Sequence, residues 1–421
     1  VSVDLPSTGG GEATIDAAAL GEFTAQITGP DGVLASSARL VLDQLGLNEA
    51  AVVVEPNADD AAILSRVETE LGADWAKLTA PAFDADKAVL LDDRWASARE
   101  DLARIVHGDD LSVSFIGAGK ALAAQAQWHA THGDPALKDR FATIAADAVT
   151  EPNARWTGET AVVTGASQGS IAAAITGQLL AGGATVVATT SGLDSKKLGF
   201  YRELYRTHAI NGAALWVVPA NMASFADVDA LTEWIGAEQT QTRAGTTTVL
   251  KPAMTPTLLF PFAAGRVAGD MSEAGSRTEI DMRILLWSVE RLITSLSAHG
   301  QDHDIDATLH VVLPGSPNRG MFGGDGGYGE AKSALDALVT RWKAERAWSE
   351  RVTLSHAIIG WVRGTGLMGG NDPLVEAVEA AGVRTWTPDE MAEALLETCT
   401  PAARAAALVE PLTVDLTGGL G

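Results

Sequence analysis

The chain has 421 residues, of which 46% are hydrophobic, and its 54 acidic and 30 basic residues give a formal net charge of −24. This length allows about two or three domains, and the composition is typical of a folded α/β protein and excludes a disordered chain. The acidity argues against the basic surface that a nucleic acid or an anionic membrane would need. The apolar runs are too short to span a bilayer, and the single cysteine, Cys399, excludes an intrachain disulfide. We therefore expect no nucleic-acid partner, no membrane segment, and a reducing, cytoplasmic location.

Both ends of the chain resemble linkers. The sequence starts with Val1, shows no signal-peptide pattern, and is glycine-rich over residues 1–13. Its last residues, 417–421, are glycine-rich as well. We therefore expect residues 1–13 to be a linker and the chain to be a fragment of a longer polypeptide.

Residues 14–155 are predicted to form a helix-rich structural region. Apolar residues recur at helical spacing most clearly over 92–106, and Gly133 closes the last helix of the region. Helices are expected at 33–45, 61–71, 92–106 and 120–132. The histidines here form no metal-ligand pattern with a cysteine or a carboxylate pair, so we predict no metal site.

From residue 156 to residue 421, short β-branched runs alternate with helical stretches, a pattern typical of βαβ units. Strands are predicted at 160–164, 184–190, 214–219, 257–262, 307–313, 353–359 and 412–416, and helices are predicted to begin near Gly169, Ser195, Ser224, Glu273 and Gly326. This alternation predicts an α/β fold with a doubly wound parallel sheet of the Rossmann type.

A glycine-rich turn follows the first of these strands. Gly165, Ser167 and Gly169 follow the strand, and Ser170 and Ile171 come next, where a helix is predicted to begin. Glycines permit a tight turn and let backbone amides approach a pyrophosphate at a helix N-terminus. The Gly-x-x-x-Gly spacing lacks the third glycine of the dinucleotide fingerprint, but its place in the βαβ series predicts a dinucleotide-binding loop.

The choice of cofactor is predicted from the end of the second strand. NAD enzymes usually place a carboxylate there to bind the ribose hydroxyls. No Asp or Glu ends this strand, and Lys196 and Lys197 follow it, which favours a 2′-phosphate and therefore NADP. Asp194 is the contrary feature, and the alternative is that the two lysines only form a solvated helix start.

Tyr328 and Lys332 stand at positions i and i+4 of a predicted helix, so they share one face. Reduction of a carbonyl needs a proton donor, and a lysine ammonium one turn away would lower the pKa of the phenol towards neutrality. Ser316 follows the preceding strand, where its hydroxyl can hold the carbonyl. These residues predict a carbonyl reductase, and the alternative is an incidental Tyr/Lys pair on an exposed helix.

Several segments of the sequence resemble one enzyme family. The segment 312–328 around the predicted catalytic residues, the segments 259–264 and 359–368, and the phosphate loop are similar to the ketoreductase domain of fungal and mycobacterial type I fatty acid synthases, within the short-chain dehydrogenase superfamily. The resemblance covers about residues 155–400, is weaker over 87–102, and is nearer to the mycobacterial form.

The resemblance implies NADPH-dependent reduction of a 3-ketoacyl chain on acyl carrier protein to the (3R)-hydroxyacyl form. It implies that Ser316, Tyr328 and Lys332 are catalytic, and that residues 156–421 are the NADP-binding ketoreductase domain. The implied cofactor site consists of Gly165, Ser167, Gly169, Ser170 and Ile171 at the phosphates, Ser191 at the 2′-phosphate, Asn221 and Met222 at the adenine, Ala263 at the ribose and Thr365 at the nicotinamide. The implied partners are the acyl carrier domain and other domains of the synthase, in a homo-oligomeric assembly.

Two positions depart from the family pattern. Gly192 stands where an arginine is frequent after the second strand, and Ser288 stands where a relay asparagine is expected. Two other functions stay open: a structural module without turnover, and a free-standing reductase of small ketones. Arg319 and Arg363, near the predicted site, either receive the acidic carrier domain or pair with local carboxylates such as Asp325.

Overall fold

The structure is a computed structural model that describes residues 72–92, 119–149, 155–210, 212–243, 246–300, 308–319, 323–366 and 373–420. The chain divides into two compact units, Val1–Val67 and Glu68–Gly421, and all described residues belong to the second. Three predicted segments lie outside the described residues: the linker over 1–13 and the helices at 33–45 and 61–71. The helix predicted at 92–106 also lies outside them, except for Asp92.

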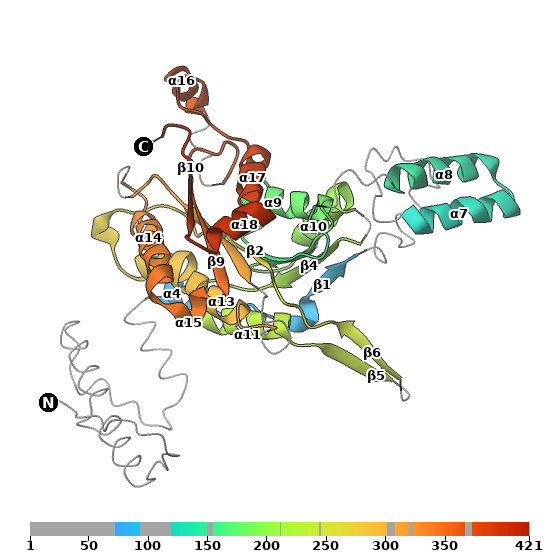
Figure 1. The fold of residues 1–421 in the computed structure, drawn as a ribbon, viewed down its shortest axis with the longest axis horizontal. Coiled ribbons are helices and arrows are strands. Elements are labelled where there is room, and N and C mark those ends of the chain that lie inside the picture. The colour runs from blue at the N-terminus through green and yellow to red at the C-terminus, as the bar shows by residue number, and fades with distance from the viewer. Residues whose placement is uncertain are drawn as a thin grey trace, which may run out of the picture. The chain divides into compact units, whose positions relative to one another are not determined.

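The described residues form a main sheet with the strand order β1-β4-β3-β2-β7-β8-β9-β10 (Figure 1). Its strands are β1 (Val89–Leu91), β2 (Thr160–Thr164), β3 (Thr185–Thr190), β4 (Ala214–Pro219), β7 (Leu258–Pro261), β8 (Leu309–Gly315), β9 (Val352–Ile359) and β10 (Leu412–Leu416). Neighbouring strands are parallel except β1 and β4. The predicted α/β fold with a doubly wound parallel sheet is confirmed, and each predicted strand lies close to its expected bounds.

The order of the strands creates a switch point in the middle of the sheet. From β2 the chain moves outward to β3 and β4, then returns to β7 on the other side of β2 and continues to β8 and β9. The chain therefore leaves β2 and β7 at the carboxyl edge of the sheet and continues to strands on opposite sides of this pair. A crevice at this point is where open α/β sheets bind their ligands.

Helices pack on the two faces of the sheet because its strands are buried on both sides. Along β2, Ala161 and Val163 belong to one apolar cluster and Val162 to the other. The helices after β2 are α9 (Ile171–Ala181), α10 (Ser195–His208), α11 (Phe225–Gly236), α12 (Ser276–Met282), α13 (Ser288–Leu296), α14 (Tyr328–Ala344), α15 (Arg346–Ser349), α16 (Val375–Ala380), α17 (Pro388–Glu397) and α18 (Pro401–Ala407). The five predicted helix starts are confirmed within three residues.

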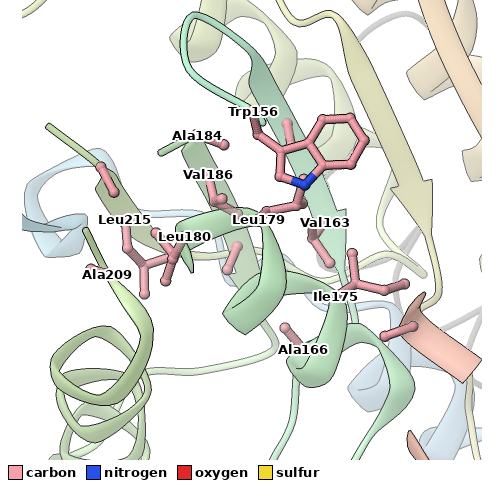
Figure 2. Close-up of a cluster of buried hydrophobic side chains, with 14 of the residues drawn as sticks. Trp156, Val163, Ala166, Ile175, Leu179, Leu180, Ala184, Val186, Ala209 and Leu215 are labelled. Carbon is pink, nitrogen blue, oxygen red and sulfur yellow. The ribbon is translucent and has the colours of Figure 1, made fainter. Parts of the chain in front are cut away.

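The first apolar cluster joins α9 to the strands on which it lies. Figure 2 shows Ile175 and Leu179 of this helix beside Val163 and Val186, with Trp156 at the edge of the group. All five side chains are buried. This packing fixes the axis of α9, and so the direction in which its N-terminus meets the loop after β2.

The sequence did not predict β1 or a separate two-stranded antiparallel sheet formed by β5 (Gln239–Arg243) and β6 (Thr246–Lys251). The hairpin is almost entirely exposed and rich in threonine and glutamine, so it has no apolar alternation that would identify its strands. Only Lys251 at its end is fully buried, where Nζ donates to the carbonyls of Ile235, Ala237 and Pro252 at 2.8–3.0 Å.

A segment upstream of residue 156 belongs to the same sheet. Helix α4 (Ala73–Thr79) and the short helix η2 (Ala85–Lys87) lead into β1, which pairs with β4. The buried carboxylate of Asp227 accepts hydrogen bonds from the backbone amides of Ala82 (2.7 Å) and Phe83 (2.8 Å). Part of the predicted helix-rich region thus extends the sheet, while the predicted domain limits themselves stay a prediction.

Two further helices, α7 (Gly119–His132) and α8 (Pro135–Val149), pack against each other (Figure 1). The prediction of a helix ending at Gly133 is confirmed, and this glycine has a φ of 124°, which favours glycine. The helix α8 was not predicted. None of the described helices combines the length and the apolar character needed to cross a membrane.

A buried histidine makes the stability of the sheet depend on pH. The ring nitrogens of His310 on β8 bond to the hydroxyls of Thr353 (2.8 Å) and Ser355 (3.1 Å), and burial lowers the pKa of His310 from 6.5 to about 4. A folded-state pKa below the unfolded one contributes stability above pH 6.5 that is lost as the pH falls towards 4. We expect a loss of about 3 kcal/mol across this window. Urea unfolding of wild type and His310→Gln at several pH values measures it, and equal pH dependence in both would contradict the assignment.

Candidate active site

The loop after β2 meets the loop after β7 at the switch point. Gly165 has a φ of 78°, and a Cβ there would lie 2.7 Å from backbone atoms of Phe262 and Ala263. The amide of Ala263 in turn donates to the hydroxyl of Thr164 at 3.0 Å. Only glycine allows this approach, and the structure therefore brings the predicted ribose neighbour Ala263 beside the phosphate loop.

The predicted phosphate loop ends at the N-terminus of α9. The hydroxyl of Ser170 caps this helix by accepting from the amide of Ala173 (3.0 Å) and donates to the carbonyl of Gly165 (3.2 Å). Within the turn, the amide of Ser167 donates to the same carbonyl at 2.8 Å. The first amides of a helix, beginning here at Ile171, have no carbonyl partner within the helix and carry a partial positive charge. This geometry fits a pyrophosphate.

The loop after β9 also reaches the phosphate loop. A Cβ on Gly169, whose φ is 77°, would lie 3.6 Å from the carbonyl oxygen of Gly364, the residue before Thr365. Thr365 is buried, and its hydroxyl donates to the carbonyl of Val362 at 3.0 Å. The residue predicted beside the nicotinamide is thus next to the loop predicted to hold the phosphates.

The ammonium group of Lys197, on α10, lies beside the backbone of the turn after β3. A Cβ on Gly192 would lie 3.9 Å from Nζ of Lys197, and Ser191 in the same turn is exposed. The carboxylate of Asp194 caps α10 by accepting from the amide of Lys197 at 2.8 Å. The feature that counted against NADP in the sequence therefore has a structural role, and Lys197 is the lysine that lies next to the turn.

Of the two residues predicted beside the adenine, Asn221 forms side-chain hydrogen bonds to other parts of the protein, and Met222 is buried. The amide group of Asn221 donates to the carbonyls of Leu78 (2.7 Å) and Ala80 (2.9 Å), and its Oδ1 accepts from the amide of Ala223 (3.0 Å). The side chain of Asn221 thus fastens the segment before β1 to the end of β4, a role that its position in the sequence did not reveal.

Ser288, at the place of the expected relay asparagine, also has its hydroxyl engaged in a hydrogen bond within the protein. It opens α13 directly after a π-helical turn, η5 (Arg283–Trp287), and is almost fully buried. Its hydroxyl donates to the carbonyl of Met222 at 2.6 Å. This hydrogen bond joins α13 to the end of β4.

The three predicted catalytic residues lie together. Ser316 follows β8, Tyr328 opens α14, and the Ser316 side chain is close enough to lower the pKa of the Tyr328 phenol. Nζ of Lys332, one turn along α14, lies 5.4 Å from the centroid of the Tyr328 ring and donates to the carbonyl of Pro314 at 2.6 Å. The strand β8 and the helix α14 therefore hold one serine, one tyrosine and one lysine in a single cluster.

The pKa values in this cluster follow from burial. Burial raises the pKa of Tyr328, the hydrogen bond with Ser316 lowers it, and the nearby carboxylate of Asp325 raises it. Burial lowers the pKa of Lys332 to about 7. The pKa of the tyrosine is thus raised, opposite to the direction predicted from the sequence, because burial desolvates the phenol.

Two buried carboxylates that the sequence analysis did not single out for the site hold the turn before Tyr328. Oδ2 of Asp325 accepts from the side-chain amide of Asn318 (2.9 Å) and from the amide of Gly329 (3.0 Å). Oδ2 of Asp281, on α12, accepts from the amide of Gly327 at 3.3 Å. An Asp three residues before the first residue of a helix is a recognisable start signal, whereas the contribution of Asp281 needs the fold.

The two arginines near the site pair with carboxylates. Arg319 lies 2.7 Å from Asp336 of α14, and Arg363 lies 3.3 Å from Glu379 and 3.8 Å from Glu390. The partners differ from the Asp325 named from the sequence. The structure therefore favours the alternative in which these arginines hold local loops over the one in which they receive a carrier domain.

Comparison with known proteins identifies proteins of similar sequence. No protein-family model matches the chain. It is 39% identical over 265 residues to a fatty acid synthase subunit alpha of Penicillium patulum, covering 62% of this chain and 14% of that subunit. It is 38% identical over 261 residues to the subunit alpha of Saccharomyces cerevisiae, covering 62% and 13%. This chain is homologous to one segment of fatty acid synthase alpha subunits. The resemblance to fungal type I fatty acid synthases is confirmed, while the nearer likeness to the mycobacterial form stays a prediction.

The homologous segment is a small part of each synthase subunit, since the chain spans about one seventh of the curated relatives' length. Among solved structures, the chain is similar to a short-chain dehydrogenase/reductase from Serratia marcescens, with 20% identity, a TM-score of 0.49, and coverage of 63% of this chain and 99% of that one. A second such protein, from Brucella melitensis, has 21% identity and the same TM-score, with coverage of 63% and 98%. The fold assignment itself rests on the strand order of the chain's own sheet.

Proposed function

We propose that this synthase segment reduces a 3-ketoacyl chain on acyl carrier protein to the (3R)-hydroxyacyl form with NADPH. The observation that carries the proposal is the cluster of Ser316, Tyr328 and Lys332, which follows the carboxyl end of β8 in the sheet that also carries the phosphate loop. The homology to fatty acid synthase subunits supports the choice of an acyl substrate.

The residues present fit a nicotinamide dinucleotide. The turn at Gly165, the N-terminus of α9 and the loop containing Thr365 lie against one another, and Lys197 lies beside the turn after β3. These residues would hold the phosphates, the nicotinamide and the 2′-phosphate. When bound, the cofactor supplies the hydride for the carbonyl carbon.

The chain's own residues supply the proton and the orientation. The hydroxyl of Ser316 holds the substrate carbonyl next to the phenol of Tyr328, whose pKa it influences from close by. Tyr328 is protonated at neutral pH, since a phenol has an ordinary pKa of 10.0 and burial raises the pKa of Tyr328 further, so a proton is available for reduction. Tyr328 donates its proton to the carbonyl oxygen, which becomes the product hydroxyl. Lys332, close to the ring, stabilises the negative charge that develops on the phenol.

Measurement of NADPH oxidation with acetoacetyl thioesters tests the proposal directly. Turnover with the thioester supports a ketoacyl reductase, and complete inactivity would favour the alternative of a structural module. A preference for carrier-bound over free ketoacyl chains separates the synthase role from a free-standing reductase of small ketones. The carrier domain, the other synthase domains, the homo-oligomeric assembly and the cytoplasmic location stay predictions.

The cofactor preference gives a sharper test at one residue. We expect the wild type to prefer NADPH over NADH, and Lys197→Ala to raise the KM for NADPH about tenfold, since a lost charge pair of about 1.4 kcal/mol corresponds to that factor. The KM for NADH should not change. The matched control is Lys196→Ala, because Lys196 is exposed on the same helix turn and none of its atoms lies within 4 Å of a Cβ placed on Gly192. Equal effects of the two substitutions would contradict the role of Lys197.

A further inference from the structure

A second buried histidine lies directly behind the catalytic serine. His356 is on β9, with 3% of its surface exposed, and is paired in register with Leu313 of the neighbouring β8. A Cβ on Gly315, the residue before Ser316, would come within 2.5 Å of Nε2 of His356. The imidazole therefore packs against the backbone from which the catalytic serine projects.

The other side of the ring faces the helix that carries the tyrosine and the lysine. Nδ1 of His356 lies 3.5 Å from Oδ1 of Asp336, which is one turn beyond Lys332 on α14. The same carboxylate pairs with Arg319, in the loop after Ser316, at 2.7 Å. His356 thus touches both elements that hold the catalytic cluster.

The hydrogen bonding of His356 is incomplete. Among the described residues, Nε2 of His356 is buried without a hydrogen-bond partner. His310, in the same sheet, has both ring nitrogens bonded to hydroxyls. Buried polar atoms are nearly always paired, so an unpaired one in a fold calls for a reason other than stability.

We propose that neutral His356 is a positioning residue that supports the turn at Gly315, and that its protonation switches the reductase off in acid. The neutral ring holds the backbone around Gly315 in place, so that the Pro314 carbonyl accepts from Lys332 and Ser316 stays next to Tyr328. A proton on the ring adds a second buried cation beside Lys332 and draws Asp336 away from Arg319. This inference rests on the proposed reductase function.

The charges around the ring set the pH at which this occurs. Burial lowers the pKa of His356 below its ordinary 6.5, Asp336 raises it, and Arg319 and Lys332 lower it. The neutral form therefore dominates at neutral pH, and the switch acts on the acid side of pH 6.5. Removal of Asp336 should move it to lower pH, and removal of Arg319 to higher pH.

The experiment is a pH profile of kcat for NADPH oxidation with an acetoacetyl thioester, from about pH 5 to about pH 8. Wild type should lose about tenfold in kcat for each pH unit below the pKa of His356, with KM for NADPH unchanged. His356→Gln, whose side chain is neutral throughout this range, should not show this fall of kcat in acid (the acid limb of the profile). His310→Gln, a buried histidine away from Gly315, is the matched control and should keep it.

Two surface variants keep the test valid if His356→Gln does not fold. Asp336→Asn should shift the acid limb to lower pH and Arg319→Gln to higher pH, as both side chains are about half exposed and tolerate substitution. An unchanged acid limb in His356→Gln, or shifts of the opposite sign in the two variants, would overturn the inference alone. A wild type without any reductase activity would overturn the proposed function and this inference with it.

Discussion

Tyr328→Phe should lower kcat for reduction of a ketoacyl thioester by a factor of about 10² to 10⁴, the range for loss of a general acid. The phenol lies next to Ser316 and is protonated at neutral pH, because burial raises its pKa above the ordinary value of 10.0. Phenylalanine keeps the ring and its contact with Lys332, so the binding of NADPH should not change. Steady-state kinetics with fluorescence titration of NADPH measures both quantities.

The control for this substitution is another tyrosine of the same chain. Tyr205 is buried, and its hydroxyl donates to the carbonyl of Ala213 at 3.1 Å, at the far end of α10. Tyr205→Phe removes a hydroxyl of the same kind and should leave kcat near wild type. If Tyr328→Phe reduces the thioester at the wild-type rate, Tyr328 is not the proton donor.

Gly165→Ala should destabilise the fold by about 2 to 4 kcal/mol, from left-handed backbone strain and overpacking together. Its φ is 78°, and the added methyl group would lie 2.7 Å from backbone atoms of Phe262 and Ala263. Because these are backbone atoms, rotation of a side chain cannot relieve the contact. The two loops of the crevice would separate, so the affinity for NADPH should fall at least about tenfold. Thermal unfolding with and without NADPH measures both effects.

The matched control is a glycine with free space around it. Gly199 is in α10, and no atom lies within 4 Å of a Cβ placed there. Gly199→Ala should stabilise the protein by about 0.5 to 1 kcal/mol through helix propensity and leave NADPH binding intact. A Gly165→Ala protein as stable as wild type would show that the loops after β2 and β7 do not touch as described.

The grouping of Ser316, Tyr328 and Lys332 could be predicted from the sequence because local spacing specifies it, whereas their catalytic roles stay a proposal. Tyr328 and Lys332 are one helical turn apart, and Ser316 ends a strand, so their proximity needs only one helix and one strand to be placed correctly. The direction of the tyrosine pKa could not be predicted, because it is set mainly by burial, which depends on the tertiary packing.

The contacts of the cofactor site were only partly predictable. The glycines of the phosphate loop are visible in the sequence, but the approach of Gly165 to Ala263 and of Gly169 to Gly364 depends on how three strands are ordered. The side chain of Asn221 was expected near an adenine, and the structure uses it to hold a segment more than a hundred residues upstream.

The sequence by itself determined the class of fold, the strands of the parallel sheet after residue 156, and the spacing of Ser316, Tyr328 and Lys332, since each depends on periodicity or spacing within a short stretch. Only the tertiary structure decided which side chains remain available for a ligand. Asn221, Ser288, Arg319 and Arg363 are polar residues that the sequence placed near the site, and each is bonded to a distant partner. The physical reason is that a buried or half-buried polar group must find a partner, and that partner is chosen by the packing of elements far apart in the chain.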